Sequence, residues 1–266
     1  MSYALGIIIF FVIAAIAAMT GIGGGTMFVP LLLLLNYSFH EATSISLFLI
    51  TVTGFSAFLR YRKEKLVDWK LALVMEVFTD MGSFTGGFTS IHINPVVLKI
   101  LFSLILIAVA MITIKVKLEY KRNKPLKEGF GYWKRNFNGI TYSIPVLYMI
   151  PLIFVAGYLS GLLGIGGGAV KIPMMILWFN IPAKVAIATS TLMVSITAAT
   201  GLGGHLVHET MDWKMALILA VGAFIGGQVG SRFSLKLPED KVKKMVGYVF
   251  ILVAIFMTTQ TLITGR

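Results

Sequence analysis

The chain of 266 residues contains no cysteine. This absence excludes disulfide bonds, metal sites built from thiolates, and any mechanism that passes sulfur through a cysteine persulfide. Charged residues are scarce, at 13% of the chain, and Asp and Glu together number only 11. Hydrophobic residues make up 57% of the chain, which is more than a water-soluble domain of this length accommodates. The composition therefore predicts an integral membrane protein.

Long apolar runs predict helices that cross the bilayer. Five of these runs are each long enough to cross about 30 Å of hydrocarbon as a helix. They cover residues 71–89, 96–114, 142–163, 212–231 and 245–263. A further run over residues 4–19 has no basic residue before it, since the first Lys or Arg is Arg60. We therefore expect this run to be retained as structure rather than cleaved as a signal peptide, in an all-α polytopic membrane protein.

The sequence contains an internal repeat. The segment "AMTGIGGGTMFVP" begins at Ala18, and the segment "GLLGIGGGAVKIP" begins at Gly161, 143 residues later. Nearly the same spacing aligns "ATSIS" with "ATSTL", "DWKLAL" with "DWKMAL", and two G-x-x-x-G patterns, which allow membrane helices to approach closely. We expect two transmembrane repeats, over residues 1–114 and 142–266, joined by a basic cytoplasmic linker over residues 115–141.

A short apolar run follows each glycine cluster, over residues 26–35 and 169–179. At 1.5 Å per residue these runs reach about 15 Å as helices, which is half the hydrocarbon thickness. We therefore predict two half-helices, which gives about five helical segments in each repeat.

Basic residues indicate how the repeats lie in the membrane, because Lys and Arg collect in cytoplasmic loops. Residues 60–70 of the first repeat contain five of them, whereas residues 205–212, the matching loop of the second, contain two histidines and two acidic residues. In the next pair of matching loops the bias is reversed, because here the loop of the second repeat is the basic one, with five basic residues between 232 and 244. This reversal predicts inverted repeats with both termini outside the cell membrane of a prokaryote. Treating each glycine-broken segment as one span would instead give eight helices and parallel repeats.

Each glycine cluster is expected to interrupt a helix. Consecutive glycines free the backbone from helical dihedral angles and leave N–H and C=O groups that lipid cannot satisfy. The half-helix that follows presents unpaired N–H groups and a partial positive charge at its first turn. We predict a small-anion site where the clusters meet near the midplane; the alternative is that these glycines serve only close helix packing. The predicted site contains Gly23, Gly24, Gly25, Thr26, Gly166, Gly167 and Gly168.

Taken together, the duplicated GIGGG cluster with its following proline, the ATS segment, the DW pair and the G-x-x-x-G helix resemble the TauE/SafE sulfite exporter family, also called the TSUP family. The resemblance covers the whole chain apart from the linker. It implies a membrane transporter that exports small sulfur-containing anions, such as sulfite, sulfoacetate or other organosulfonates, without a cofactor. The resemblance does not determine which of these anions is transported.

The hydroxyl side chains of the two ATS segments are further candidate ligands. Thr43, Ser44, Thr189 and Ser190 fall in predicted helices close to the half-helices, and hydroxyl groups donate hydrogen bonds to an anion without carrying charge. The alternative is that they bond to carbonyl groups of their own helix or across a helix contact.

Three charged residues are predicted inside the membrane, where charge is costly and usually functional. Lys171 lies in the second half-helix, where the first has Phe28, and would attract the anion or extend its ammonium group to the interface. Glu76 and Asp80 lie on one face of a predicted helix and are candidates for coupling to protons or another ion. We prefer Asp80 as the coupling residue, and Lys171 is a possible ion-pair partner of these carboxylates. The alternative for Glu76 is a position near the cytoplasmic end of its helix.

The remaining polar residues indicate neither a metal nor a nucleic acid. His40, His92, His205 and His208 are predicted in loops outside, and His205, His208 and Asp212 could together hold a metal, although solvated loops are the preferred interpretation. The basic linker is expected to contact anionic lipid, despite the net charge of +12.

The leading functional hypothesis is a secondary transporter in which one repeat rocks against the other around a site between the glycine clusters. A passive anion channel could use the same backbone and hydroxyl groups. An intramembrane enzyme with Ser190 or Ser195 as the nucleophile is a third alternative, but we expect no catalytic activity because the histidines are predicted to lie in loops.

Overall fold

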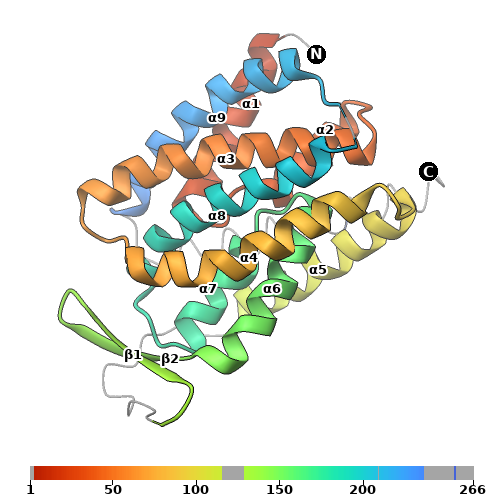
Figure 1. Cartoon of the computed structure of the whole chain (residues 1–266). Helices are drawn as coiled ribbons and strands as arrows, with labels where there is room; N and C mark the ends of the chain where they lie inside the picture. Colours follow the sequence, from red (N-terminus) through yellow and green to blue (C-terminus); the bar gives the residue numbers. More distant parts are fainter. Residues whose placement is uncertain (1–2, 116–128, 209, 237–254, 256–266) are drawn as a thin grey trace.

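A computed structural model of the protein describes residues 3–115, 129–208, 210–236 and 255, and within these ranges it is mostly helical (Figure 1). The helices are α1 (Tyr3–Thr20), α2 (Gly25–Leu34), α3 (Phe39–Lys63), α4 (Trp69–Ser90), α5 (Pro95–Lys115), α6 (Val146–Leu163), α7 (Gly168–Leu177), α8 (Ala183–Leu206) and α9 (Trp213–Ser234). Two antiparallel strands, β1 (Tyr132–Phe137) and β2 (Ile140–Pro145), complete the described elements.

The helical membrane protein predicted from composition is confirmed. Among the described helices, α1, α3, α6, α8 and α9 are long and apolar enough to cross a bilayer. Both predicted half-helices are present, because α2 and α7 contain ten residues each. The predicted span over residues 245–263 lies outside the described residues.

The β-hairpin was not predicted, and it corrects one helix boundary. The span expected over residues 142–163 begins as a helix only at Val146, because residues 140–145 form β2. The turn between the strands consists of Asn138 and Gly139, with φ angles of 49° and 75°. An Asn-Gly pair is favoured in such turns because both central residues need a positive φ. The hairpin also extends across the predicted boundary between the linker and the second repeat.

The repeated DW motif begins a helix in both halves. Asp68 accepts a hydrogen bond from the Leu71 N–H at 3.2 Å, and Asp212 accepts one from the Met215 N–H at 3.0 Å. Each aspartate therefore satisfies a backbone donor that the first turn of α4 or α9 would otherwise leave unpaired. The motif is structural in both halves.

The long helices lie side by side in the order α1, α9, α3, α8, α4, α6 (Figure 1). The outer pairs pack through glycines: a Cβ atom at Gly86 of α4 would collide with the Tyr158 carbonyl oxygen of α6, and one at Gly226 of α9 with the Phe11 carbonyl oxygen of α1. The predicted G-x-x-x-G patterns thus allow backbone to pack directly on backbone. Each outer pair joins a helix of one half to a helix of the other.

At the centre, α3 and α8 occupy equivalent places in the two halves and run in opposite directions. Near the start of α3, Leu47 lies beside Gly201, and further along, Gly54 lies beside Thr191. Between these contacts the Ser195 hydroxyl donates to the Thr51 carbonyl oxygen at 2.8 Å. Residue numbers therefore rise along α3 while those of the contacting residues fall along α8, so the two helices are antiparallel.

We expect Gly161→Ala to destabilise the protein, because a Cβ atom there would collide with the Ser83 carbonyl oxygen. Overpacking of this kind costs about 1–3 kcal/mol, which exceeds the gain of about 1 kcal/mol in helix propensity. Gly203→Ala is the matched control, since its nearest neighbour is a Phe84 ring atom at 4.0 Å, and it should be neutral or stabilising. Thermal unfolding in detergent measures both variants; equal melting temperatures would contradict this packing.

Candidate functional site

Both glycine clusters adopt the left-handed backbone that permits a helix to break. The φ angles of Gly23 and Gly24 are 99° and 88°, and those of Gly166 and Gly167 are 81° and 72°. Residues other than glycine rarely adopt these angles. Gly24 and Gly167 are the N-cap residues of α2 and α7, so each half-helix begins directly from its cluster.

The two clusters contact each other. A Cβ atom at Gly25 would collide with the Gly164 carbonyl oxygen, and one at Gly168 would lie 2.7 Å from the Gly21 carbonyl oxygen. Side chains of the central helices cover the junction: Ile50 of α3 and Val194 of α8 lie within 3.3 Å of the Cβ positions of both Gly23 and Gly166. Two segments 143 residues apart in the sequence therefore form one closely packed backbone core.

Hydroxyl groups from the central helices bind the carbonyl oxygens that the helix breaks release. Ser190 of α8 donates to the Gly21 carbonyl oxygen at 2.8 Å, and Ser46 of α3 donates to the Gly164 carbonyl oxygen at 2.9 Å. Each central helix thus stabilises the cluster of the opposite half. Ser46 belongs to the ATSIS segment, but it was not among the preferred ligands predicted from the sequence.

The other predicted hydroxyl residues differ in their surroundings. Thr43 donates to the Phe39 carbonyl oxygen of its own helix at 2.8 Å, and Thr189 accepts from the Asp68 N–H at 3.0 Å. Thr26 and Ser44 are buried, and their hydroxyl oxygens have no hydrogen-bond partner among the described residues. Among the hydroxyl groups predicted from the sequence, these two are therefore the ones left available to a ligand in the described structure.

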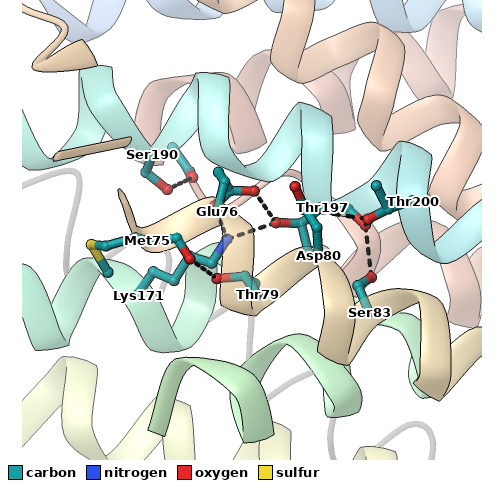
Figure 2. A network of polar contacts seen from close by, with 10 residues as sticks. Met75, Glu76, Thr79, Asp80, Ser83, Lys171, Ser190, Thr197 and Thr200 are labelled. Atoms are coloured by element: carbon teal, nitrogen blue, oxygen red, sulfur yellow. Dashed lines mark hydrogen bonds and ion pairs between the residues drawn. The ribbon is translucent and has the colours of Figure 1, made fainter. Parts of the chain in front are cut away.

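A buried ion pair joins α7, which begins at the second cluster, to α4 (Figure 2). The Nζ atom of Lys171 in α7 lies 2.6 Å from Oε1 of Glu76 in α4, and it donates to Oγ1 of Thr197 in α8 at 2.6 Å. Thr197 in turn donates to Oε2 of Glu76 at 2.7 Å. The side chain of Lys171 is 0% exposed and that of Glu76 is 4% exposed, so both charges are compensated inside the protein.

This arrangement corrects two of the alternatives drawn from the sequence. Lys171 does not extend to an interface, and Glu76 does not lie in a solvated helix end, because the two side chains neutralise each other in the interior. Asp80, which was expected to be the stronger coupling candidate, contacts Thr200 at 3.4 Å, one turn further along α4 (Figure 2). Glu76, rather than Asp80, is the carboxylate hydrogen-bonded to the lysine.

A second polar cluster, missed from the sequence, joins the hairpin to the helices. Arg135 of β1 donates to both carboxylate oxygens of the fully buried Asp68, with its closest contact at 2.6 Å, and the Tyr142 hydroxyl of β2 donates to the same carboxylate. These hydrogen bonds raise the pKa of the Arg135 guanidinium, and burial with the bond to Asp68 raises the pKa of Tyr142. Since Asp68 also donates its N–H to Thr189, this Asp68 cluster links the hairpin, α4 and α8.

The matching position in the second half has a simpler environment. Asp212 accepts a hydrogen bond from the Tyr37 hydroxyl at 3.2 Å. Burial and the nearby Asp212 charge raise the pKa of Tyr37 to about 12, so the hydroxyl stays protonated and can donate.

The histidines differ from the prediction. His205 lies in α8, is 1% exposed, and places Nε2 at 2.9 Å from the Gly161 carbonyl oxygen, while His40 lies in α3. Only His92 and His208 lie in loops as expected. Within the described ranges no group of three His, Asp or Glu side chains is placed to hold a metal ion.

Comparison with known proteins identifies the family. The family model described as "Sulfite exporter TauE/SafE" matches residues 6–257. The chain belongs to the TauE/SafE family. It is 30% identical to the probable membrane transporter protein YunE of Bacillus subtilis, over 95% of this chain and 96% of that protein. A probable membrane transporter protein of Methanocaldococcus jannaschii is 25% identical over 94% of this chain and 93% of its own length. No solved structure matches the chain.

The buried pair in this TauE/SafE family member should behave as a single energetic unit. Breaking a buried ion pair by removing one partner costs about 3–5 kcal/mol, because the other charge is left uncompensated. We therefore expect Lys171→Met and Glu76→Gln each to lower the free energy of unfolding strongly, and the double variant to lose much less than the sum. Unfolding in mixed detergents measures the cycle. Arg60→Gln with Glu64→Gln, a pair at 3.4 Å whose side chains are 33% and 43% exposed, is the control and should be additive within about 0.5 kcal/mol.

The Asp68 cluster predicts a stabilising role for the hairpin. Arg135→Gln removes both charged hydrogen bonds to a carboxylate that stays buried, and we expect the free energy of unfolding to fall by about 1–3 kcal/mol. Arg62→Gln is the matched control, because Arg62 is exposed and its guanidinium lies 5.8 Å from the centre of the Trp69 ring. A loss no larger than that of the control would show that the hairpin does not support α4.

Proposed function

We propose that the protein is a secondary transporter that exports a small sulfur-containing anion, such as sulfite, sulfoacetate or another organosulfonate, by alternating access. The observation that carries the proposal is the meeting of the two glycine clusters, each of which begins a half-helix. Helix N-termini carry unpaired N–H groups and a partial positive charge, so they attract anions. The family to which the chain belongs supports the choice of a sulfur anion.

Inverted repeats would supply the two conformations of the carrier. The opposite directions of α3 and α8 support this orientation, since equivalent helices of parallel repeats would run the same way. The close packing of Ile50 and Val194 over the junction favours a carrier over an open channel, because the anion can enter only when these contacts separate. We place the protein in the cell membrane with both termini outside, from the distribution of its basic residues.

Glu76 is the proposed coupling residue, with Asp80 as a second carboxylate on the same helix. While Glu76 is charged, its carboxylate holds the ammonium group of Lys171 at 2.6 Å. A proton on Glu76 would cancel this attraction and free the positive charge for the anion. The movement of one proton would thus be linked to binding or release of one negative charge.

Efflux from vesicles tests this function. Reconstituted protein in vesicles loaded with sulfite should release the anion with saturable kinetics, at a rate that depends on the pH gradient. In Glu76→Gln the pH dependence should disappear, because the proton acceptor is lost. Glu64→Gln, which alters an exposed carboxylate at the end of α3, is the control and should retain it.

A different pattern would reject the proposal. Large ionic currents without saturation would indicate a channel, and an absence of efflux for sulfite and for organosulfonates would exclude the proposed substrates. Unchanged pH dependence in Glu76→Gln would remove Glu76 from the coupling step.

A further inference from the structure

The N-termini of the two half-helices are equivalent in backbone but not in their surroundings. At α2, a Cβ atom on the N-cap Gly24 would lie 2.9 Å from the Ala17 methyl group and 2.9 Å from the Phe28 ring. The Phe28 ring is itself fully buried and stacks on Phe10 with 5.4 Å between centroids. Apolar groups therefore crowd the N-cap residue, and the polar side chain of this turn is the buried Thr26, whose hydroxyl has no partner in the described part of the chain.

At α7 the same place is lined by polar side chains. A Cβ atom on the N-cap Gly167 would lie 3.5 Å from Oγ of Ser160 and 3.5 Å from Cε of Lys171. These are ordinary contact distances, so the surroundings of Gly167 are less crowded than those of Gly24. The spacing of 143 residues that relates the clusters pairs Ala17 with Ser160 and Phe28 with Lys171. The second half thus has a hydroxyl and an ammonium group where the first has a methyl group and a ring.

The Ser160 hydroxyl lacks the partner that a buried hydroxyl normally has. Ser160 is 0% exposed, and Oγ has no hydrogen-bond partner among the residues that the structure describes. Its carbonyl oxygen, in contrast, accepts from the Gly164 N–H at 2.9 Å. A buried polar group without a partner costs about 1–3 kcal/mol, so such groups are uncommon unless something else binds them.

We propose that the N-terminus of α7, the Ser160 hydroxyl and Lys171 form the anion subsite of the transporter. The ligand class is a sulfur oxyanion, whose oxygens accept hydrogen bonds from the hydroxyl and from the first-turn N–H groups. This inference rests on the proposed function and narrows it to one half of the molecule. Ser160 would act as a specificity-determining ligand that the sequence motifs do not include.

The subsite would give Lys171 a second negatively charged partner besides Glu76. In the described conformation its Nζ atom binds Glu76 and Thr197, while its Cε atom lies beside the subsite. An oxyanion at Gly167 would therefore compete with Glu76 for the same ammonium group. Loss of the carboxylate charge would favour the oxyanion.

Calorimetric titration of the purified full-length protein with sulfite, and separately with sulfoacetate, tests the subsite. A hydrogen bond to a charged group contributes enough that its loss weakens binding by about tenfold or more, so Ser160→Ala should raise the dissociation constant at least tenfold. Its melting temperature without anion should not fall, because the hydroxyl that is removed has no partner. Thr53→Val is the matched control: it removes another buried hydroxyl that lacks a partner in the described structure, beside the first cluster, and should leave the affinity within about twofold.

Each other outcome overturns the inference. If Ser160→Ala binds as tightly as the wild type, or if Thr53→Val loses as much affinity, the α7 subsite is wrong while the transport function stands. If the wild type binds neither sulfite nor sulfoacetate, the proposed function fails and the subsite fails with it.

Discussion

Backbone that leaves a helix inside a membrane must find partners within the protein, and this constraint governs the centre of the fold. Lipid offers no hydrogen bonds, so the glycine clusters persist only because each lies against the other. Ser46 and Ser190 then supply donors to carbonyl oxygens of the opposite cluster. The antiparallel contact of α3 with α8 is what brings these two serines to the junction. A single interrupted helix would lack both the facing cluster and the serine of the other half.

The buried ion pair depends on the same junction. Because α7 begins at the cluster, Lys171 lies in its first turn, from which the ammonium group reaches Glu76 of α4 and Thr197 of α8. Such a pair contributes little net stability, since desolvation of two charges offsets their attraction. Its retention in a chain with so few acidic residues is more easily understood as a functional feature. The first half, with Phe28 at the equivalent position, shows that the backbone does not require a charge there.

Features set by local sequence or by the internal repeat could be predicted, whereas most features set by other tertiary contacts could not. The half-helices followed from run length after a glycine cluster, and the N-caps at Asp68 and Asp212 explain the repeated DW pair. Lys171 was predicted as a possible partner of the membrane carboxylates, but the choice of Glu76 over Asp80 depends on a contact between residues 95 positions apart, which no local pattern specifies. His205 was assigned to the polar loop before the second DW pair, yet α8 continues to Leu206, and its glycines allow the helix to pack closely and bury His205. The hairpin could have been predicted, because Asn-Gly is a favoured turn sequence. It was missed because the surrounding residues were assigned to a basic linker.

The Asp68 cluster gives the two ends of the helix bundle unequal strength. At one end the hairpin, α4 and α8 are joined through a fully buried carboxylate with a guanidinium and a phenol, whereas Asp212 at the matching position receives a single hydroxyl. In a carrier whose halves separate at alternate faces, the free energies of the two open states would then differ even without any gradient. Such a molecule would be found mostly in the conformation that is closed at the end joined through Asp68, and opening at that end would be the slower step of its cycle.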